Sequence, residues 1–457
     1  SDLSMMRTTI FSVLSTLLHI NTAKSLDNGI GLLPPMGWRS WNCYGENVNQ
    51  SLMESIMDRI TERVRLVDGT PTSLADLGYI HVGLDDNWQK CGAGIHGSFH
   101  DKDGNPIINK DTFPNMKAMT DYAHSLGLLA GWYMNNCICA EHEYILETEI
   151  ELHMIQSAKA VAEAGFDGVK LDGCGQFRNL TWWAELLNAT GRHIMIENCH
   201  WGGTVPGDYN GDAPCNGLET MPSDCPYNFF RTSGDIRNNW HSMFFNLQTT
   251  IDYQGDPPLS RPGAWAYPDM LEVGRLASFV EDRTHFGAWV ITSSPLILGN
   301  DLHNDVVMDK IWPIVANPEA ISINQVWYGH PGRLAKQWTP PNPPSLSSGS
   351  NDIMQLWVKP ISKGTWAALI INAHSLMPCD ASLSYADIGL PDGQIFAVRD
   401  VWARRDAGTW KGGFLSTDVI LPHDSRLYVF TQCENSGDII KAGSLINGDD
   451  RTYLSVK

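Results

Sequence analysis

Short apolar runs alternate with longer amphipathic stretches along the first two thirds of the chain. Apolar runs bounded by turn residues are typical of buried strands. Eight such runs lie between about residues 30 and 300, at 36–41, 79–84, 128–134, 168–171, 193–197, 229–234, 264–267 and 289–298. The stretches between them have helical periodicity, such as the Ala- and Glu-rich run around Met154–Ala164, which ends at Gly165, a suitable C-cap.

These strands recur at the spacing of a strand–helix repeat. Eight strands with helices between them, in a stretch of about 270 residues, favour a closed barrel over an open sheet. The pattern therefore predicts an α/β protein whose first domain, residues 26–325, is a (β/α)8 barrel.

The pattern changes after about residue 335. Residues 337–352 are rich in Pro and Ser and have no apolar periodicity, which predicts a loop or linker. Short β-type runs follow, separated by turn residues, and they predict a C-terminal antiparallel β-sandwich within 326–434. Residues 435–457 are polar and are expected to form a loosely ordered tail.

The N-terminus resembles an export signal. Arg7 precedes an apolar run from Ile10 to Ile20, and small and polar residues follow up to residue 25. These features are typical of a secretory signal peptide, and the run is too short to span a membrane. We therefore expect a signal peptide within 1–25, with residues 1–4 an artefact upstream of Met5; the alternative is a buried N-terminal helix.

Three sequons agree with export. Asn49, Asn179 and Asn188 each begin an Asn-X-Ser/Thr triplet, although such triplets also arise by chance. We expect a protein that is secreted or delivered to a vacuole or lysosome, that has no stable membrane span, and for which a homodimer is an open alternative.

Composition narrows the classes of partner. The 457 residues include 32 Lys and Arg against 51 Asp and Glu, a formal net charge of −19, and 43% are hydrophobic. This apolar content excludes disorder as the main state. The acidic balance argues against nucleic acid as a partner, because phosphate binding requires a concentrated basic surface. Ten cysteines are too few to define a disulfide scaffold in a chain of this length, although export would permit disulfides.

Acidic and aromatic residues gather where the predicted strands end, the place where barrel enzymes carry their catalytic groups. In chain order these residues are Trp38, Trp41, Asp85, Asp86, Tyr133, Lys170, Asp172, Glu197, His200, Trp201, Arg231, Asp235, Asp269 and Met270. Aromatic faces stack on the C–H faces of sugars, and two carboxyl groups can flank a glycosidic bond. A single Asp at such a position is as often a helix cap, but the combined set predicts a glycosidase site.

Six segments carry a resemblance to a known family. They are GLLPPMGWRSWN (31–42), ADLGYIHVGLDDNW (75–88), DGNPIINKDTFPNMKAMTDYAHSLGLLAGWY (103–133), AGFDGVKLDGCG (164–175), FRTSGDIRNNW (230–240) and AYPDML (266–271). In this order they resemble the family 27 glycoside hydrolases, the α-galactosidases and α-N-acetylgalactosaminidases. The resemblance covers about residues 30–433, including the C-terminal β-module.

The resemblance implies a catalytic pair. Asp172 would be the nucleophile, and Asp235 would act first as general acid and then as general base, so that the α configuration is retained. Their carboxyl groups should lie about 5–5.5 Å apart, as in other retaining pairs. Lys170 points to the same side of its strand as Asp172 and should keep it ionised. An acidic pH optimum is expected, because Asp235 must be protonated part of the time.

The other matched positions imply substrate contacts. Asp85 and Asp86 would bind the 4- and 6-hydroxyls of a galacto-configured sugar, and Trp38 and Tyr133 would shape the pocket wall. Further substrate contacts are implied for Arg231 and Asp269, which would hold hydroxyls near C2 and C3, and for Met270, which would line the pocket.

The segment 197–217 departs from the family. It matches neither pattern by which family members recognise the C2 substituent, and His200 and Trp201 occupy that position. Their bulk leaves less room for an N-acetyl group, so we expect terminal α-D-galactosyl substrates. An α-N-acetylgalactosaminidase and a β-L-arabinopyranosidase are the alternatives within the family.

The resemblance also implies disulfides. The family commonly has Cys where this chain has Asn87, and Cys91, four residues on, could substitute for it and pair with Cys43. Cys174 would pair with Cys139 or Cys137, and Cys199 by position with Cys225, while Cys379 and Cys433 could join strands of the β-module. Cys215 is then left over. The alternative is that these residues are unpaired buried thiols.

Two rival functions fit less well. A metal-dependent barrel hydrolase would carry His-x-His after the first strand; that motif is absent and no His pair has ligand spacing, so we expect no metal and no cofactor. The second rival is a secreted sugar-binding protein on an inactive hydrolase barrel. It predicts the loss of Asp172 or Asp235, and both residues are present.

Overall fold

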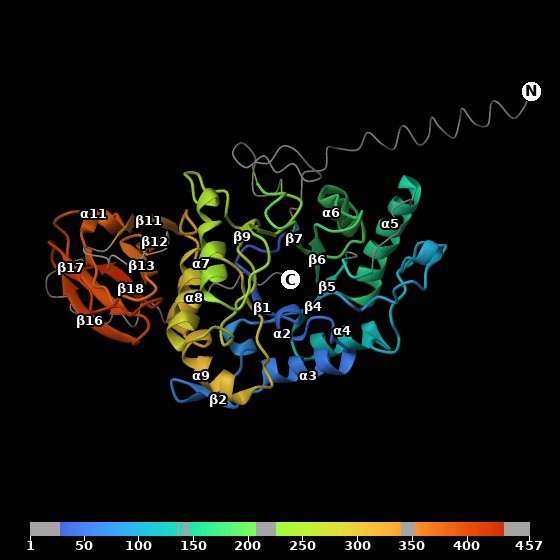
Figure 1. Ribbon diagram of the computed structural model, residues 1–457, viewed down its shortest axis with the longest axis horizontal. Helices are drawn as coiled ribbons and strands as arrows, with labels where there is room; N and C mark the ends of the chain where they lie inside the picture. The colour runs from blue at the N-terminus through green and yellow to red at the C-terminus, as the bar shows by residue number, and fades with distance from the viewer. Residues whose placement is uncertain (1–27, 135–136, 140–145, 207–224, 340–351, 434–457) are drawn as a thin grey trace, which may run out of the picture.

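A computed structural model describes residues 28–134, 137–139, 146–206, 225–339 and 352–433 (Figure 1). The expected signal peptide, most of the expected linker and the C-terminal tail therefore lie outside the described residues. Among the helices in the described part of the chain, none is long and apolar enough to cross a membrane.

Eight parallel strands form one curled sheet. They are β1 (Met36–Arg39), β4 (His81–Leu84), β5 (Leu129–Tyr133), β6 (Gly168–Asp172), β7 (Met195–Cys199), β8 (Phe229–Arg231), β9 (Trp265–Tyr267) and β10 (Leu296–Leu298). Their order in the sheet is β10-β1-β4-β5-β6-β7-β8-β9. Just beyond β9, Leu271 forms a parallel bridge with Leu298 of β10, and this bridge joins the two edges of the sheet. The predicted barrel is confirmed.

The helices of the barrel domain lie between these strands in sequence or, for the last two, follow β10. They are α2 (Trp41–Tyr44), α3 (Gln50–Thr61), α4 (Met116–Ser125), α5 (Glu147–Ala164), α6 (Leu180–Ala189), α7 (Trp240–Gln248), α8 (Phe279–Ile291), α9 (Asp305–Val315) and α10 (Pro318–Asn324). A hairpin of β2 (Arg65–Val67) and β3 (Thr70–Thr72) follows α3. Asn caps several helices: Asn239, for example, accepts from the Ser242 N–H at the start of α7. Gly165, in the left-handed conformation, ends α5 as predicted.

The eighth predicted strand is wrong over its first half. Residues 289–291 form the end of helix α8, and only Leu296–Leu298 form strand β10. Every residue of α8 from Phe286 to Ile291 is buried, and this half of the helix is apolar without a polar face. A short apolar run of this kind looks the same in a buried helix and a buried strand.

The C-terminal module is built on an antiparallel sheet. Its strands are β11 (Arg333–Trp338), β12 (Met354–Ser362), β13 (Thr365–Asn372), β18 (Ser425–Gln432), β15 (Phe396–Asp400) and β16 (Arg405–Trp410), in that spatial order. A small second sheet of β14 (Ser382–Leu383) and β17 (Leu415–Ser416), together with α11 (Tyr385–Ile388), packs on one face. The predicted antiparallel β module is confirmed, but β11 extends to Trp338, where a loop was expected from residue 337.

The main sheet of this module buries both of its faces. Along β13, Ala368 and Ile370 contact the small second sheet, whereas Leu369 and Ile371 belong to the same core as the barrel. Helices α7 and α8 stand between the barrel strands and the orange-red module (Figure 1), and α8 contacts β12, β13 and β18. One continuous core therefore joins the two parts of the chain.

Candidate active site

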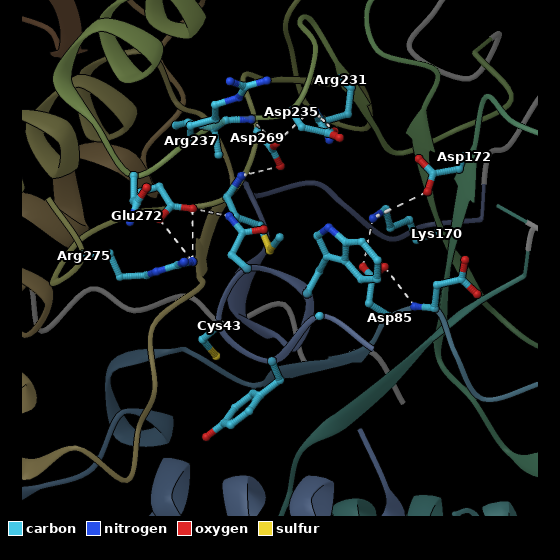
Figure 2. Close-up of a pocket in the computed structure, with 18 of the residues that line it drawn as sticks. Cys43, Asp85, Lys170, Asp172, Arg231, Asp235, Arg237, Asp269, Glu272 and Arg275 are labelled. Carbon is cyan, nitrogen blue, oxygen red and sulfur yellow. Dashed lines mark hydrogen bonds and ion pairs between the residues drawn. The ribbon is translucent and has the colours of Figure 1, made fainter. Parts of the chain in front are cut away.

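A pocket of about 700 Å³ opens at the carboxyl ends of the barrel strands. Among the predicted site residues it is lined by Asp85, Asp86, Lys170, Asp172, Trp201, Arg231, Asp235, Asp269 and Met270. Figure 2 shows Asp172, Lys170 and Asp85 on one side, Glu272 and Arg275 on the other, and Arg231, Asp235 and Asp269 between them. The strand ends thus bring most of the predicted site together.

Lys170 is buried and contacts two carboxylates of the pocket. Its ammonium group lies 2.9 Å from Asp85 Oδ2 and 3.8 Å from Asp172 Oδ2. Burial alone would lower the pKa of Lys170, but the carboxylates of Asp172 and Asp85 outweigh burial and hold that pKa well above its usual value. Lys170 is therefore charged at every physiological pH, and it offers both carboxylates a counterion.

A second buried cation, Arg39, also contacts Asp85. Arg39 of β1 lies 3.6 Å from Asp85 Oδ2 and also pairs with Glu197 of β7. Burial would raise the pKa of Asp85, but Lys170 and Arg39 reverse this effect and lower it. Asp85 is thus an ionised, fixed acceptor. Sequence reasoning missed Arg39, although a charged residue inside the apolar run 36–41 was a signal that it had a buried partner.

Asp86 has a different environment from its neighbour. Its carboxylate accepts hydrogen bonds from the Asn87 N–H, the Gln89 amide and the Ile138 N–H, at 2.8, 2.8 and 3.1 Å. Burial nevertheless raises the pKa of Asp86 to about 6, and the hydrogen bonds only limit that rise. Asp86 can therefore carry a proton in mildly acidic solution.

Arg231 links two carboxyl groups on the third side of the pocket. Its guanidinium lies 2.9 Å from Asp269 Oδ2 and 3.1 Å from Asp235 Oδ1. The side chain of Asp269 is 5% exposed, whereas that of Asp235 is 67% exposed. Asp235 thus faces the open pocket and is accessible to water, while Asp269 is held in place.

Three residues predicted to contact the substrate, the wall residues Trp38 and Tyr133 and the C2-position residue His200, do not line the pocket. Trp38 is buried and donates its indole N–H to Asn300 O at 2.8 Å. Tyr133 is buried with its ring 5.5 Å from the Lys170 ammonium, and His200 is buried with Nδ1 2.9 Å from Thr204 Oγ1. Trp41, three residues after Trp38, lines the pocket instead.

The far side of the pocket consists of residues that sequence reasoning did not select. Glu272 is 1% exposed, accepts a hydrogen bond from Asn42, and lies 3.2 Å from Arg275. Burial raises the pKa of Glu272 to about 7 even though Arg275 opposes this effect. Arg237 and Tyr44 also line this side. Glu272 comes directly after the AYPDML segment, and Arg275 lies three residues further on. The acidic residue immediately after this segment was the signal in the sequence that pointed to this side of the pocket.

The disulfides correct part of the expected pairing. Cys137 bonds Cys174, one of the two expected alternatives, with Cα atoms 5.4 Å apart. Cys91 bonds Cys139, with Cα atoms 5.2 Å apart, and not Cys43, which is free. The loop after β5 lies over the carboxyl end of β4, as the Ile138–Asp86 bond shows, and brings Cys139 within bonding range of Cys91.

Two further expected disulfides are wrong. Cys199 is a free buried thiol at the end of β7 whose sulfur accepts from Arg231, and Cys225 is disulfide-bonded to another residue. Cys379 and Cys433 are also free. Cys379 forms an antiparallel bridge with Ile420, whereas the Cys433 N–H donates a hydrogen bond to Ile395 O. The two cysteines therefore have different backbone partners.

Comparisons with known proteins agree with this geometry. Residues 33–326 match the family model described as alpha galactosidase A, and 351–430 match the alpha galactosidase C-terminal beta sandwich domain. An alpha-galactosidase of Cyamopsis tetragonoloba is 31% identical over 90% of this chain and 90% of its own length. An alpha-N-acetylgalactosaminidase of Gallus gallus is 28% identical over 87% of this chain and 93% of its own length. The solved alpha-galactosidase of Saccharomyces cerevisiae has a TM-score of 0.72 at 20% identity, over 89% of this chain and 99% of that one.

Proposed function

Because the chain belongs to glycoside hydrolase family 27, the family of the α-galactosidases, we propose that it hydrolyses terminal α-D-galactosyl residues and retains their configuration. The observation that carries this proposal is the pairing of Asp172, held beside Lys170, with the exposed carboxyl of Asp235 in one pocket. Both residues reach the pocket from the ends of barrel strands.

Asp172 would act as the nucleophile. Its carboxylate oxygen bonds to the anomeric carbon while the bond from that carbon to the glycosidic oxygen breaks. The Lys170 ammonium, 3.8 Å from Asp172 Oδ2, places a positive charge beside this carboxylate. The product of the first step is a β-linked glycosyl–enzyme ester at Asp172.

Asp235 would supply and recover the proton. Its carboxyl group protonates the departing oxygen, and its carboxylate then takes a proton from the water that bonds to the anomeric carbon and displaces Asp172. Its 67% exposure leaves room for this water. The separation of the two carboxyl groups stays a prediction of about 5–5.5 Å.

Asp85 and Asp86 would hold the hydroxyls that define a galacto-configured sugar. Both carboxyl groups are buried and fixed by the contacts described above, which places acceptors at set points on the pocket floor. Rigid acceptors lose little entropy when a sugar hydroxyl binds to them. They also discriminate between sugars, because a sugar lacking the matching hydroxyl makes one hydrogen bond fewer to a buried carboxylate.

Trp201 favours galactose over N-acetylgalactosamine. A Cβ atom at Gly173 would lie 3.1 Å from two atoms of the Trp201 ring, so the indole packs directly over the residue after Asp172. The ring is 41% exposed and lines the pocket. Its bulk near the nucleophile reduces the space for an N-acetyl group.

The nucleophile is tested by Asp172→Asn, with Asp111→Asn as the control because the Asp111 side chain is 81% exposed. We expect Asp172→Asn to abolish turnover of p-nitrophenyl α-galactoside while galactose binding, measured by calorimetry, persists. The control should match the wild type. Equal turnover by Asp172→Asn and the wild type would reject Asp172 as the nucleophile.

The substrate class is tested by a parallel assay. The α-galactoside, the α-N-acetylgalactosaminide and the β-L-arabinopyranoside of p-nitrophenol are compared by kcat/KM. We expect the galactoside to be cleaved best. β-L-Arabinopyranose is galactose without its hydroxymethyl group, so some activity on it is compatible with the site. Preference for the N-acetyl substrate would overturn the role given to Trp201.

We further infer that the protein is exported through the secretory pathway and glycosylated. The support is the signal-like N-terminus together with sequons whose asparagines, Asn49, Asn179 and Asn188, are all exposed. Expression from Met5 in eukaryotic cells should deliver active protein to the medium, and removal of N-glycans should lower its mass. Retention in the cytosol with unchanged mass would contradict this.

A further inference from the structure

Asp269 has an unusual backbone conformation. Its φ is 86°, a left-handed value that side-chain-bearing residues rarely adopt. In this conformation its carboxylate accepts from the Ile236 and Met270 N–H groups, each at 2.8 Å, and lies 2.9 Å from the Arg231 guanidinium. A strained conformation of this kind persists only where surrounding contacts hold it.

Helix α8 provides such contacts. The Trp289 indole N–H donates to Asp269 O at 2.7 Å, His285 Nε2 accepts from the Glu272 N–H at 2.8 Å, and Asp282 Oδ1 accepts from the Gly274 N–H at 2.7 Å. Residues 282, 285 and 289 share one face of the helix because they are spaced by three and four. One helix face therefore binds the backbone of the segment 269–274.

His285 is suited to this role. Burial lowers its pKa to about 3, so the imidazole is neutral at physiological pH and its Nε2 can accept the hydrogen bond. His285 and Trp289 are both fully buried, and their rings pack edge to face with centroids 4.1 Å apart. The Trp289 donor and the His285 acceptor thus pack against each other, which restricts the position of both rings.

Two other side chains of α8 anchor the helix to the C-terminal module. Arg283 pairs with both oxygens of Asp424, at 2.6 and 2.7 Å, and Glu281 lies 2.8 Å from His423. The helix therefore contacts both the C-terminal module and the segment 269–274.

We propose that Trp289 is a positioning residue for the sugar-binding carboxylate: its indole N–H, fixed by α8, holds Asp269 in the left-handed conformation that directs its side chain toward Arg231 and the pocket. This inference rests on the proposed function, because it assumes that Asp269 contacts the sugar. It assigns the C-terminal module a part in substrate binding through α8.

The test compares Trp289→Phe with Trp265→Phe. Phenylalanine keeps most of the packing volume but removes the indole donor. Trp265 is an equally buried tryptophan that donates to a backbone carbonyl, Gly31 O, at 2.8 Å, and it does not line the pocket. The two variants therefore lose the same kind of bond at different places. Melting temperature, kcat and KM for p-nitrophenyl α-galactoside are measured for both.

We expect both variants to lose similar stability but only Trp289→Phe to lose substrate affinity. Without the indole donor Asp269 is no longer held toward Arg231, and we expect this displacement to raise KM and the galactose dissociation constant about tenfold. Similar KM values for the two variants would overturn the inference. An inactive wild type would instead overturn the proposed function, so the two failures are distinguishable.

A double-mutant cycle separates positioning from general loosening of the fold. If Trp289 acts through Asp269, then Trp289→Phe should weaken galactose binding by less than about twofold when Asp269→Asn is already present. Full additivity of the two changes would show that Trp289 supports the pocket by another route and would overturn the inference.

Discussion

At the scale of single residues, burial and counterions set the charge of each pocket carboxyl. Asp85 and Asp86 are adjacent in sequence, yet burial raises the pKa of Asp86, whereas Lys170 and Arg39 lower that of Asp85 in spite of burial. The protein thus obtains one permanently ionised acceptor and one that can be protonated from two equal side chains. The difference comes entirely from their neighbours.

Lys170 should be critical for both stability and activity. Lys170→Met leaves the buried carboxylates of Asp85 and Asp172 short of a cation, so we expect a loss of about 3–5 kcal/mol in the free energy of unfolding, with a strong fall in kcat. Urea unfolding measures the loss. Lys159→Met is the control, because Lys159 is 62% exposed and pairs with Glu163 at 3.6 Å on the surface of α5. Equal stability of the two variants would contradict the role of Lys170.

Glu272 should make the fold more stable in acid than at neutral pH. Its pKa is about 7 in the folded protein against 4.5 for the ordinary carboxyl. Between pH 4.5 and 7 the unfolded chain has lost the proton of Glu272, whereas the folded protein keeps it. The contribution of Glu272 to the free energy of unfolding is therefore full below about pH 4.5 and falls by about 3 kcal/mol in total as the pH rises to 7.

Glu272→Gln removes this titration and should flatten the fall in stability between pH 4.5 and 7. Urea unfolding at a series of pH values measures it. Glu62→Gln serves as the control, because the Glu62 side chain is 40% exposed, and it should follow the wild-type curve. A Glu272→Gln curve as steep as that of the wild type would show that other groups cause the fall.

At the scale of elements, each barrel strand delivers side chains to the pocket, and the loops after the strands are tied to one another. Two disulfides join the loop after β5 to the loops after β4 and β6. The same loop places the Ile138 N–H on Asp86. Covalent ties at this end of the barrel restrict the loops that carry the sugar-binding groups.

The observed disulfide pattern predicts different effects for neighbouring cysteines. Cys91→Ser combined with Cys139→Ser should lower the free energy of unfolding by about 2–4 kcal/mol, because the unfolded chain gains freedom. Cys43→Ser should change it by less than about 0.5 kcal/mol, because Cys43 is free and half-buried. Peptide mapping without reduction should recover the Cys91–Cys139 pair, and a Cys43–Cys91 peptide would contradict the structure.

At the scale of the whole molecule, the barrel and the C-terminal module share one core. Trp357, Leu369 and Val429 of the module belong to the same buried cluster as the barrel residues of α8. This arrangement explains why α8 is apolar on all sides from Phe286 to Ile291, since the barrel covers one face of the helix and the module covers the other.

Gly287 marks the closest approach of α8 to the module. A Cβ atom there would lie 2.8 Å from the Trp402 ring and 3.0 Å from Leu369 Cδ1. Gly287→Ala would normally favour a helix by about 1 kcal/mol, but the overpacking should outweigh this, and we expect a net loss of about 1–3 kcal/mol. Thermal unfolding measures the change, and adding Trp402→Leu should restore part of the loss. A stabilised Gly287→Ala variant would contradict this packing.

The sequence by itself determined the strand positions and the residues that end them. The apolar runs located all eight barrel strands, and the order of Asp85, Asp172, Asp235 and Asp269 along the chain predicted a shared pocket, because parallel strands in a barrel end at one rim. These features are local, since each depends on a run of a few residues and on the side chains directly after that run.

Only the tertiary structure decided which residues meet across the barrel. The partner of Cys91, the burial of Trp38 away from the pocket, the Arg39–Glu197 pair and the Trp289 contact with Asp269 all join segments far apart in sequence. The end of α8 was taken for a strand for a related reason: its periodicity is masked when both the barrel and the module bury it. Such contacts depend on the paths of loops and on packing from all sides, and a pattern within one segment carries no information about either.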